Sequence, residues 1–129
     1  MVSRALDWFK QAERDLEQAE DSRRAGRHEW ACFAAQQAAE KAVKGLHLHH
    51  GQEFWGYIIA RSLQELPKTL VVPGDLIEKA KVLDNYYIPA RYPNSHPAGV
   101  PFEHYGPLQS GPAVAYAREI IDFVRVQMA

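Results

Sequence analysis

Six of the chain's eight prolines lie in one segment, residues 85–112, and this segment limits the folds that the chain can adopt. Proline lacks an amide hydrogen and fixes φ, so the segment is not expected to form a regular helix. It also holds four of the six tyrosines, which makes it too aromatic for a solvated linker. Long loops inside compact domains are uncommon and are often functional. The sequence therefore predicts an ordered, Pro-rich, non-helical loop.

Helical patterns lie on both sides of this loop. Five stretches are expected to be helical: residues 3–24, 28–50, 60–66, 75–86 and 112–127. Apolar residues mark one face of the first, fourth and fifth, the second is rich in alanine, and Pro67 ends the short third one. Ser3 is expected to cap the first helix, and Pro112 is expected in the first turn of the last one. No stretch alternates convincingly as a strand would. These patterns predict an all-α fold, an antiparallel up-and-down bundle of four to five helices with the long Pro-rich loop before the last helix.

Composition limits the class of protein. A chain of 129 residues is expected to form a single domain, and its net charge of −1 gives no overall attraction to nucleic acid or membrane. The one cysteine, Cys32, rules out an internal disulfide and fits a reducing compartment. No run approaches the roughly 18 apolar residues of a membrane span, and no signal peptide is recognisable. The expectation is a cytoplasmic protein without membrane contact.

Three stretches together resemble a known family: A-E-R-D-L at 12–16, E-W-A-C-F-A-A-Q-Q-A-A-E-K-A-V-K-G-L at 29–46, and A-K-V-L-D-N-Y-Y-I-P-A-R-Y-P-N at 80–94. They resemble the HEPN domain family (higher eukaryotes and prokaryotes nucleotide-binding). The resemblance implies a helical bundle that usually forms a homodimer. It also implies a minimal nucleotidyltransferase as partner, in a toxin–antitoxin-like pair. Catalytic members are metal-independent ribonucleases in which an arginine, four to six further residues and a histidine meet across a dimer cleft.

Arg91 and His96 match that spacing within the Pro-rich loop. Cleavage of RNA without a metal needs an acid and a base, which histidine can supply, and a cation for the phosphorane, which arginine supplies. The Tyr92-Pro93 pair that follows the arginine departs from catalytic members, which often carry a polar residue there. The alternative is that Arg91 pairs with a carboxylate or a helix end, or binds a ligand, while His96 is an exposed loop residue.

Aromatic residues around Arg91 admit two interpretations. Tyr92 and Tyr105 are the more open candidates for stacking on a base, as in single-stranded RNA sites, with Asn94 beside them. Tyr86 and Phe102 are expected to pack the loop onto the bundle. In one subgroup of the family, the partner attaches nucleotide to a tyrosine two residues after the histidine. That position is Ala98 here, so this regulation is not carried over.

The remaining candidates favour structural roles. The Arg23–His28 pair also has the spacing but spans a turn between helices, where surface charge explains it. His47 and His50, with His49 between them, can share a metal, yet stabilisation of a helix C-terminus is simpler, and no metal or cofactor is expected. Cys32 is expected to be a small buried residue. Gln36, Gln37 and Glu40 can face either a cleft or solvent.

Three functions follow. The first is a nucleotide-binding and interaction module, homodimeric and paired with a nucleotidyltransferase, that uses Arg91, Tyr92, Asn94 and Tyr105. The second is a metal-independent endoribonuclease that uses Arg91 and His96 as catalytic residues. The third is a structural subunit whose loop only packs.

Overall fold

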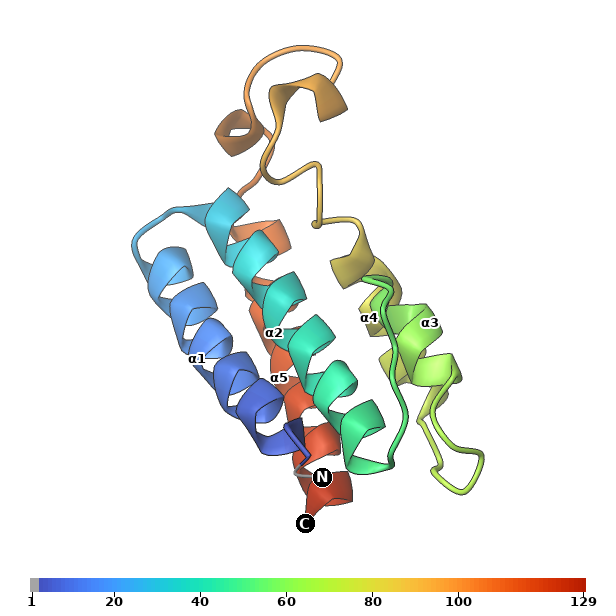
Figure 1. The fold of residues 1–129 in the computed structure, drawn as a ribbon. Coiled ribbons are helices and arrows are strands. Elements are labelled where there is room, and N and C mark those ends of the chain that lie inside the picture. Colours follow the sequence, from blue (N-terminus) through green and yellow to red (C-terminus); the bar gives the residue numbers. More distant parts are fainter. Residues whose placement is uncertain (1–2) are drawn as a thin grey trace.

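The computed structural model describes residues 3–129 of the chain, and every regular element among them is helical (Figure 1). The elements are α1 (Ala5–Arg24), α2 (His28–His49), α3 (Ile59–Gln64), α4 (Gly74–Asp84), the short 3-10 helices η1 (Pro93–Ser95) and η2 (Pro101–Glu103), and α5 (Pro107–Met128). The predicted all-α bundle is confirmed. No helix among residues 3–129 has both the length and the apolar content that crossing a membrane requires.

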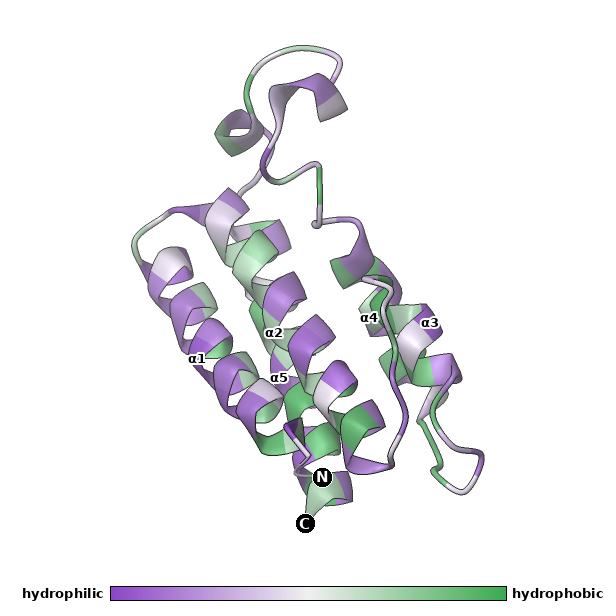
Figure 2. Cartoon of the chain, in the orientation of Figure 1, coloured by the Kyte–Doolittle hydropathy of each residue, from purple (hydrophilic) through white to green (hydrophobic). Residues whose placement is uncertain are grey.

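Helix α2 lies at the centre of the bundle, with α1 on one side, the short α3 and α4 on the other, and α5 behind it (Figure 1). Its buried face consists largely of small residues: Ala31, Cys32, Ala35, Ala38, Ala39, Ala42 and Gly45. These small side chains let the neighbouring helices come close. A Cβ atom added at Gly45 would lie only 3.0 Å from the carbonyl oxygen of Ala5 on α1. Figure 2 shows hydrophilic residues along the outer side of α1, as an amphipathic helix requires.

Helix α5 begins at Pro107, one turn and more before the predicted start at Pro112, so the Pro-rich loop spans residues 85–106. The start is fixed by Gln109, whose Oε1 accepts the amide of Gly106 at 2.8 Å. Pro112 lies inside the helix, where it cannot donate to the carbonyl of Leu108. This loss is tolerable because Leu108 is 87% exposed, so water can reach the turn.

Other boundaries differ from the predicted ones by one or two residues. Helix α3 covers 59–64 and α4 ends at Asp84. Arg4, not Ser3, occupies the N-cap position of α1, although the Ser3 hydroxyl accepts the amide of Ala5 at 3.2 Å. Such shifts are expected, because helix ends depend on local capping bonds that periodicity does not reveal.

Asp84 joins α3 to α4. Its two carboxylate oxygens accept the amides of Ile59, at 2.6 Å, and of Ala60, at 3.1 Å. These amides belong to the first turn of α3, where a helix has no acceptors of its own for its N–H groups. Burial raises the pKa of Asp84, and the two amide hydrogen bonds oppose that shift. The last residue of α4 therefore caps the start of α3.

We predict that Asp84→Ala lowers the free energy of unfolding by about 1–2 kcal/mol, because two amides at a helix start lose their acceptor. Asp84→Asn keeps one acceptor oxygen and should lose less. Chemical denaturation at neutral pH measures both. Asp122→Ala, which removes an exposed carboxylate paired with Arg125, is the control and should cost less than about 1 kcal/mol. Equal losses at positions 84 and 122 would contradict the capping role.

Candidate functional site

Arg91 lies at the base of the Pro-rich loop against three aromatic rings. Its guanidinium carbon is 4.4 Å from the ring centroid of Phe33, 4.9 Å from that of Tyr87 and 5.1 Å from that of Tyr92. The Nε atom donates to the carbonyl of Tyr87 at 2.8 Å. We call Arg91 with these three aromatic residues the Arg91 cradle. It joins α2, which carries Phe33, to the segment that follows α4.

The terminal nitrogens of Arg91 remain available for a ligand. No carboxylate among residues 3–129 forms an ion pair with this side chain. The expected alternative, in which Arg91 pairs with a carboxylate, is therefore wrong for the described residues. Its one side-chain hydrogen bond goes to a backbone carbonyl only four residues earlier. Arginine carries five N–H donors, so most of them are still free to meet an anion.

Local structure explains how the loop positions Arg91. The amide of Arg91 donates to the carbonyl of Ile88 at 3.0 Å, which closes a turn around Pro89. Ala90, within that turn, is buried. Tyr87 stacks on Tyr57 with ring centroids 4.3 Å apart, so the ring under the guanidinium is itself supported.

His96 occupies a different environment from Arg91. Its Nε2 lies 2.7 Å from the carbonyl of Pro89, and since a carbonyl only accepts, Nε2 must carry the proton. In the neutral ring, the Nδ1 atom is then an acceptor. The ring stacks on that of His104 at 4.2 Å and meets Tyr105 edge-on at 6.0 Å. His96 is thus a partly buried residue, which corrects the alternative that made it an exposed loop side chain.

Arg91 and His96 have separate sets of partners. Among residues 3–129 no hydrogen bond links the two side chains, and the aromatic rings around the arginine differ from those around the histidine. One protomer therefore provides two groups on one loop rather than a directly bonded pair. Their catalytic role stays a prediction.

The aromatic residues of the loop are arranged differently from the prediction in two cases. Tyr92 is 47% exposed and open, as expected, and Asn94 is exposed in η1. Tyr105, expected to be open, is partly buried and meets Tyr86 edge-on at 5.8 Å. Phe102, expected to pack, is 65% exposed. The physical reason is the position of each residue in the loop. Tyr105 shortly precedes α5 and packs against Tyr86, whereas Phe102 lies in η2 on the outer side of the loop.

Burial has chemical consequences for the packed tyrosines and the cysteine. It raises the pKa of Tyr86 to about 12 and also raises the pKa of Tyr105, so both stay protonated at neutral pH. Burial raises the pKa of the Cys32 thiol to about 12 as well. The interpretation of Cys32 as a small buried residue is confirmed, because a thiol protonated at neutral pH and fully buried is a poor nucleophile.

Two histidines have structural roles that the sequence did not indicate. His28, interpreted as surface charge, contacts the buried hydroxyl of Ser110 on α5, with Nδ1 and Oγ 2.7 Å apart. His47, interpreted as a cation at a helix end, is only 2% exposed, and its Nε2 donates to the carbonyl of Ser62 at 2.8 Å. Both corrections have one cause: the polar partner comes from a distant part of the chain. Within residues 3–129 no three potential metal ligands gather.

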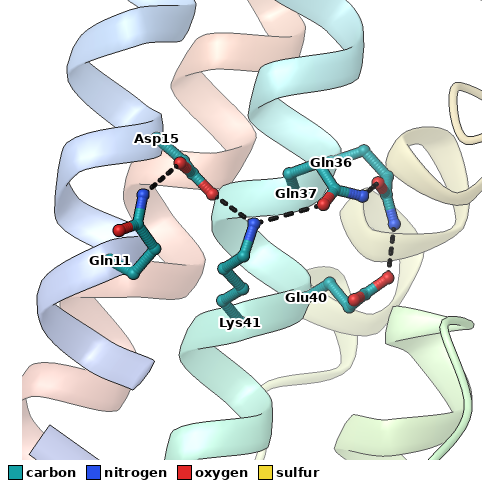
Figure 3. A network of polar contacts seen from close by, with 6 residues as sticks. All are labelled: Gln11, Asp15, Gln36, Gln37, Glu40 and Lys41. Carbon is teal, nitrogen blue, oxygen red and sulfur yellow. Dashed lines mark hydrogen bonds and ion pairs between the residues drawn. The ribbon is translucent and has the colours of Figure 1, made fainter. Parts of the chain in front are cut away.

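A network of polar side chains connects α1 to α2 (Figure 3). Lys41 donates to Asp15 at 2.6 Å and to Gln37 at 3.2 Å. Gln37 donates to Gln36 at 2.8 Å, and Gln36 donates to Glu40 at 3.1 Å. Gln36 is fully buried, so the alternative that placed it on a solvated face is wrong. Burial raises the pKa of Glu40, and its bond from Gln36 and two nearby lysines oppose the shift.

The raised pKa of Glu40 predicts a pH-dependent effect on stability. A carboxyl whose folded pKa exceeds its unfolded value contributes stability below the unfolded pKa, and that contribution is lost as the pH rises through the folded pKa. The glutamine side chain in Glu40→Gln can still accept a hydrogen bond from Gln36. We therefore expect the free energy of unfolding of this variant to rise relative to that of the native chain as the pH increases from about 4 to about 7. Unfolding free energies over this range measure the difference. Glu17→Gln, at an exposed position, controls for the lost charge, and a flat or falling difference at position 40 would refute the expectation.

Comparison with known proteins agrees with this fold. A family model described as "HEPN domain" matches residues 5–127. TT1696 from Thermus thermophilus is 51% identical, with a TM-score of 0.95, and the alignment covers 98% of this chain and 99% of that one. ST0689, an archaeal HEPN homologue, is 39% identical, with a TM-score of 0.84 and coverage of 99% and 100%. An HEPN domain protein from Thermotoga maritima is 34% identical, with a TM-score of 0.76 and coverage of 93% and 95%. No curated protein matches.

Proposed function

The chain belongs to the HEPN domain family, and we propose that it is a nucleotide-binding module in which Arg91 holds a phosphate group. The observation that carries this proposal is the Arg91 cradle. An arginine there has no carboxylate partner among the described residues, yet aromatic rings fix its orientation. A guanidinium with free terminal donors binds phosphate through two parallel hydrogen bonds.

The surroundings of Arg91 also fit a nucleotide better than a free anion. Tyr92, half exposed, offers an aromatic face on which a base can stack. Asn94 is exposed two residues further along, and its amide can donate and accept hydrogen bonds. Tyr105 is partly buried against Tyr86, so we assign it to holding the loop rather than to contacting the ligand. Arg91 and Tyr92 are therefore the main contacts, with Asn94 beside them.

We further propose that the module acts as a homodimer and together with a minimal nucleotidyltransferase, in a toxin–antitoxin-like pair. Family resemblance is the basis for both partners. Exposed apolar side chains on the Pro-rich loop and at the start of α5 support a protein contact there. Phe102 is 65% exposed and Leu108 is 87% exposed. The cytoplasmic location expected from the sequence stays a prediction.

We predict that Arg91→Ala weakens nucleotide binding about 10- to 100-fold, the effect of losing a hydrogen bond to a charged group. Arg91→Lys keeps the charge but not the paired donors, so its affinity should lie between those of the other two proteins. Titration of nucleoside mono-, di- and triphosphates by calorimetry measures the loss. Arg61→Ala, which removes an exposed arginine paired with Glu65, is the matched control. Binding to Arg91→Ala as tight as to the native chain, or no binding to the native chain, would refute the proposal.

One observation favours a second function, that of a metal-independent endoribonuclease. The bond from Nε2 of His96 to Pro89 leaves Nδ1 as an acceptor, which a general base needs. Such a base would take the proton of the RNA 2′-hydroxyl while that oxygen attacks phosphorus, and an acid would protonate the leaving 5′-oxygen. The two copies of His96 in a homodimer supply one base and one acid. Arg91 would stabilise the phosphorane.

The nuclease reaction predicts RNA cleavage that persists in a chelator. His96→Ala should abolish cleavage but retain nucleotide binding, whereas Arg91→Ala should weaken both. Gel analysis of a labelled single-stranded RNA measures cleavage, and His49→Ala, at an exposed position, is the control. Cleavage that survives His96→Ala, or that requires a metal, would exclude this second function.

A further inference from the structure

A groove of about 500 Å³ lies along α1 and the first half of α2, next to the Arg91 cradle. Phe33 belongs to both, because it lines the groove and also lies under the Arg91 guanidinium. The groove and the proposed nucleotide site therefore meet at the Phe33 ring. A ligand held at Arg91 can extend into it along α2.

Two aromatic rings, those of Trp30 and Phe33, line the groove. Trp30 is 50% exposed and meets Phe33 edge-on, with ring centroids 6.1 Å apart. A half-exposed tryptophan in a groove offers a face for stacking that the bundle does not use. Stacking on aromatic faces is how proteins hold successive bases of a single strand.

Positive charge borders these aromatic rings on both sides. Arg27, exposed at the N-cap of α2, lines the groove, and none of the described carboxylates forms an ion pair with it. Along α2, Arg27 precedes Trp30 by three residues and Phe33 by six, which is about 9 Å of helix. Arg91 contacts the Phe33 end. Two arginines without carboxylate partners among residues 3–129 thus flank one pair of aromatic rings.

The carboxylate in the groove does not cancel this charge. Asp15 is the groove's acidic residue, and it pairs with Lys41 at 2.6 Å (Figure 3). Gln37 and Gln18 also line the groove and add amide groups. Gln18 donates to Ser22 through its nitrogen, so its carbonyl oxygen can still accept from a base edge.

We propose that this groove binds the nucleotide next to the one held by Arg91, so that the ligand is a single-stranded oligonucleotide of at least two nucleotides. Trp30 stacks on the second base, and Arg27 contacts the second phosphate. The inference rests on the proposed function of Arg91 and names its ligand class. A duplex is disfavoured, because its bases are already stacked on one another and cannot lie on Trp30.

The test compares a mononucleotide, UMP, with the single-stranded hexanucleotides U6 and dT6 and with a duplex of about 12 base pairs. We expect at least one hexanucleotide to bind the native chain roughly tenfold more tightly than UMP. Trp30→Ala should lower the hexanucleotide affinity about tenfold and leave UMP binding unchanged. Trp30→Phe should retain most of the hexanucleotide affinity. Trp55→Ala, at an 82% exposed tryptophan outside the groove, is the matched control.

Salt dependence separates the phosphate contact from stacking. Each phosphate contact contributes about 0.7 to the slope of log affinity against log salt for a single strand. Arg27→Ala should therefore reduce that slope by about 0.7, whereas Trp30→Ala should leave it unchanged. Arg14→Ala, an exposed arginine of α1 paired with Glu17, controls for loss of one positive charge. Thermal unfolding of each variant verifies that it is folded.

The outcomes distinguish the two proposals. If UMP binds and needs Arg91, but hexanucleotides bind no more tightly and Trp30→Ala changes nothing, the groove inference is overturned and the proposed function stands. If Arg91→Ala binds UMP like the native chain, the proposed function fails, and the groove inference with it. Duplex binding as tight as that of the hexanucleotides would also overturn the groove inference.

Discussion

The structure depends on the close approach of α1 and α5 to the small-residue face of α2. Ala35, Ala38, Ala39 and Ala42 are all fully buried, and Gly45 leaves room for the backbone of α1. The larger residues Val43, Leu46 and His47 of α2 are also buried. The two aromatic residues of α2, at positions 30 and 33, lie outside this buried face and reach the surface, where they become available to a ligand. The packing that stabilises the bundle also places the aromatic rings of the proposed site.

The loop is ordered because the bundle supplies its partners. Tyr86 and Tyr105 pack edge-on under it, and Tyr87 stacks on Tyr57 from the segment before α3. Backbone carbonyls within the loop then orient its two histidines, at positions 96 and 104, each through a contact of 2.7 Å to Nε2. Arg91 and the two stacked imidazoles thus have different partners within the loop. The proposed binding at Arg91 does not require the histidines, whereas the proposed cleavage would need both groups and a second protomer.

Much of the fold could be predicted, since periodicity, alanine content and the clustered prolines located five helices and the Pro-rich loop between the last two. The errors lie where one hydrogen bond decides a boundary, as the bond from Gly106 to Gln109 does for α5. Of the site, Arg91 was found from its sequence motif, but its contact with Phe33 joins distant parts of the chain. His28 and His47 were misread for the same reason, and Gln36 was left open between a cleft and solvent until its burial was seen. Each is a polar residue that the sequence suggests is exposed to solvent. In the folded protein, a partner from another segment or the bundle itself covers it.

The sequence by itself determined the class of the protein. Helical periodicity, the alanine-rich face of α2 and the cluster of prolines each act locally, so they can be read without coordinates. The sequence motif also identified Arg91 as the candidate site residue. Only the tertiary structure decided that Arg91 has aromatic neighbours and no carboxylate among the described residues, and that Arg27, Trp30 and Phe33 line one groove. Burial, stacking and the absence of an ion pair depend on segments brought together by folding, and no pattern along the chain reports them.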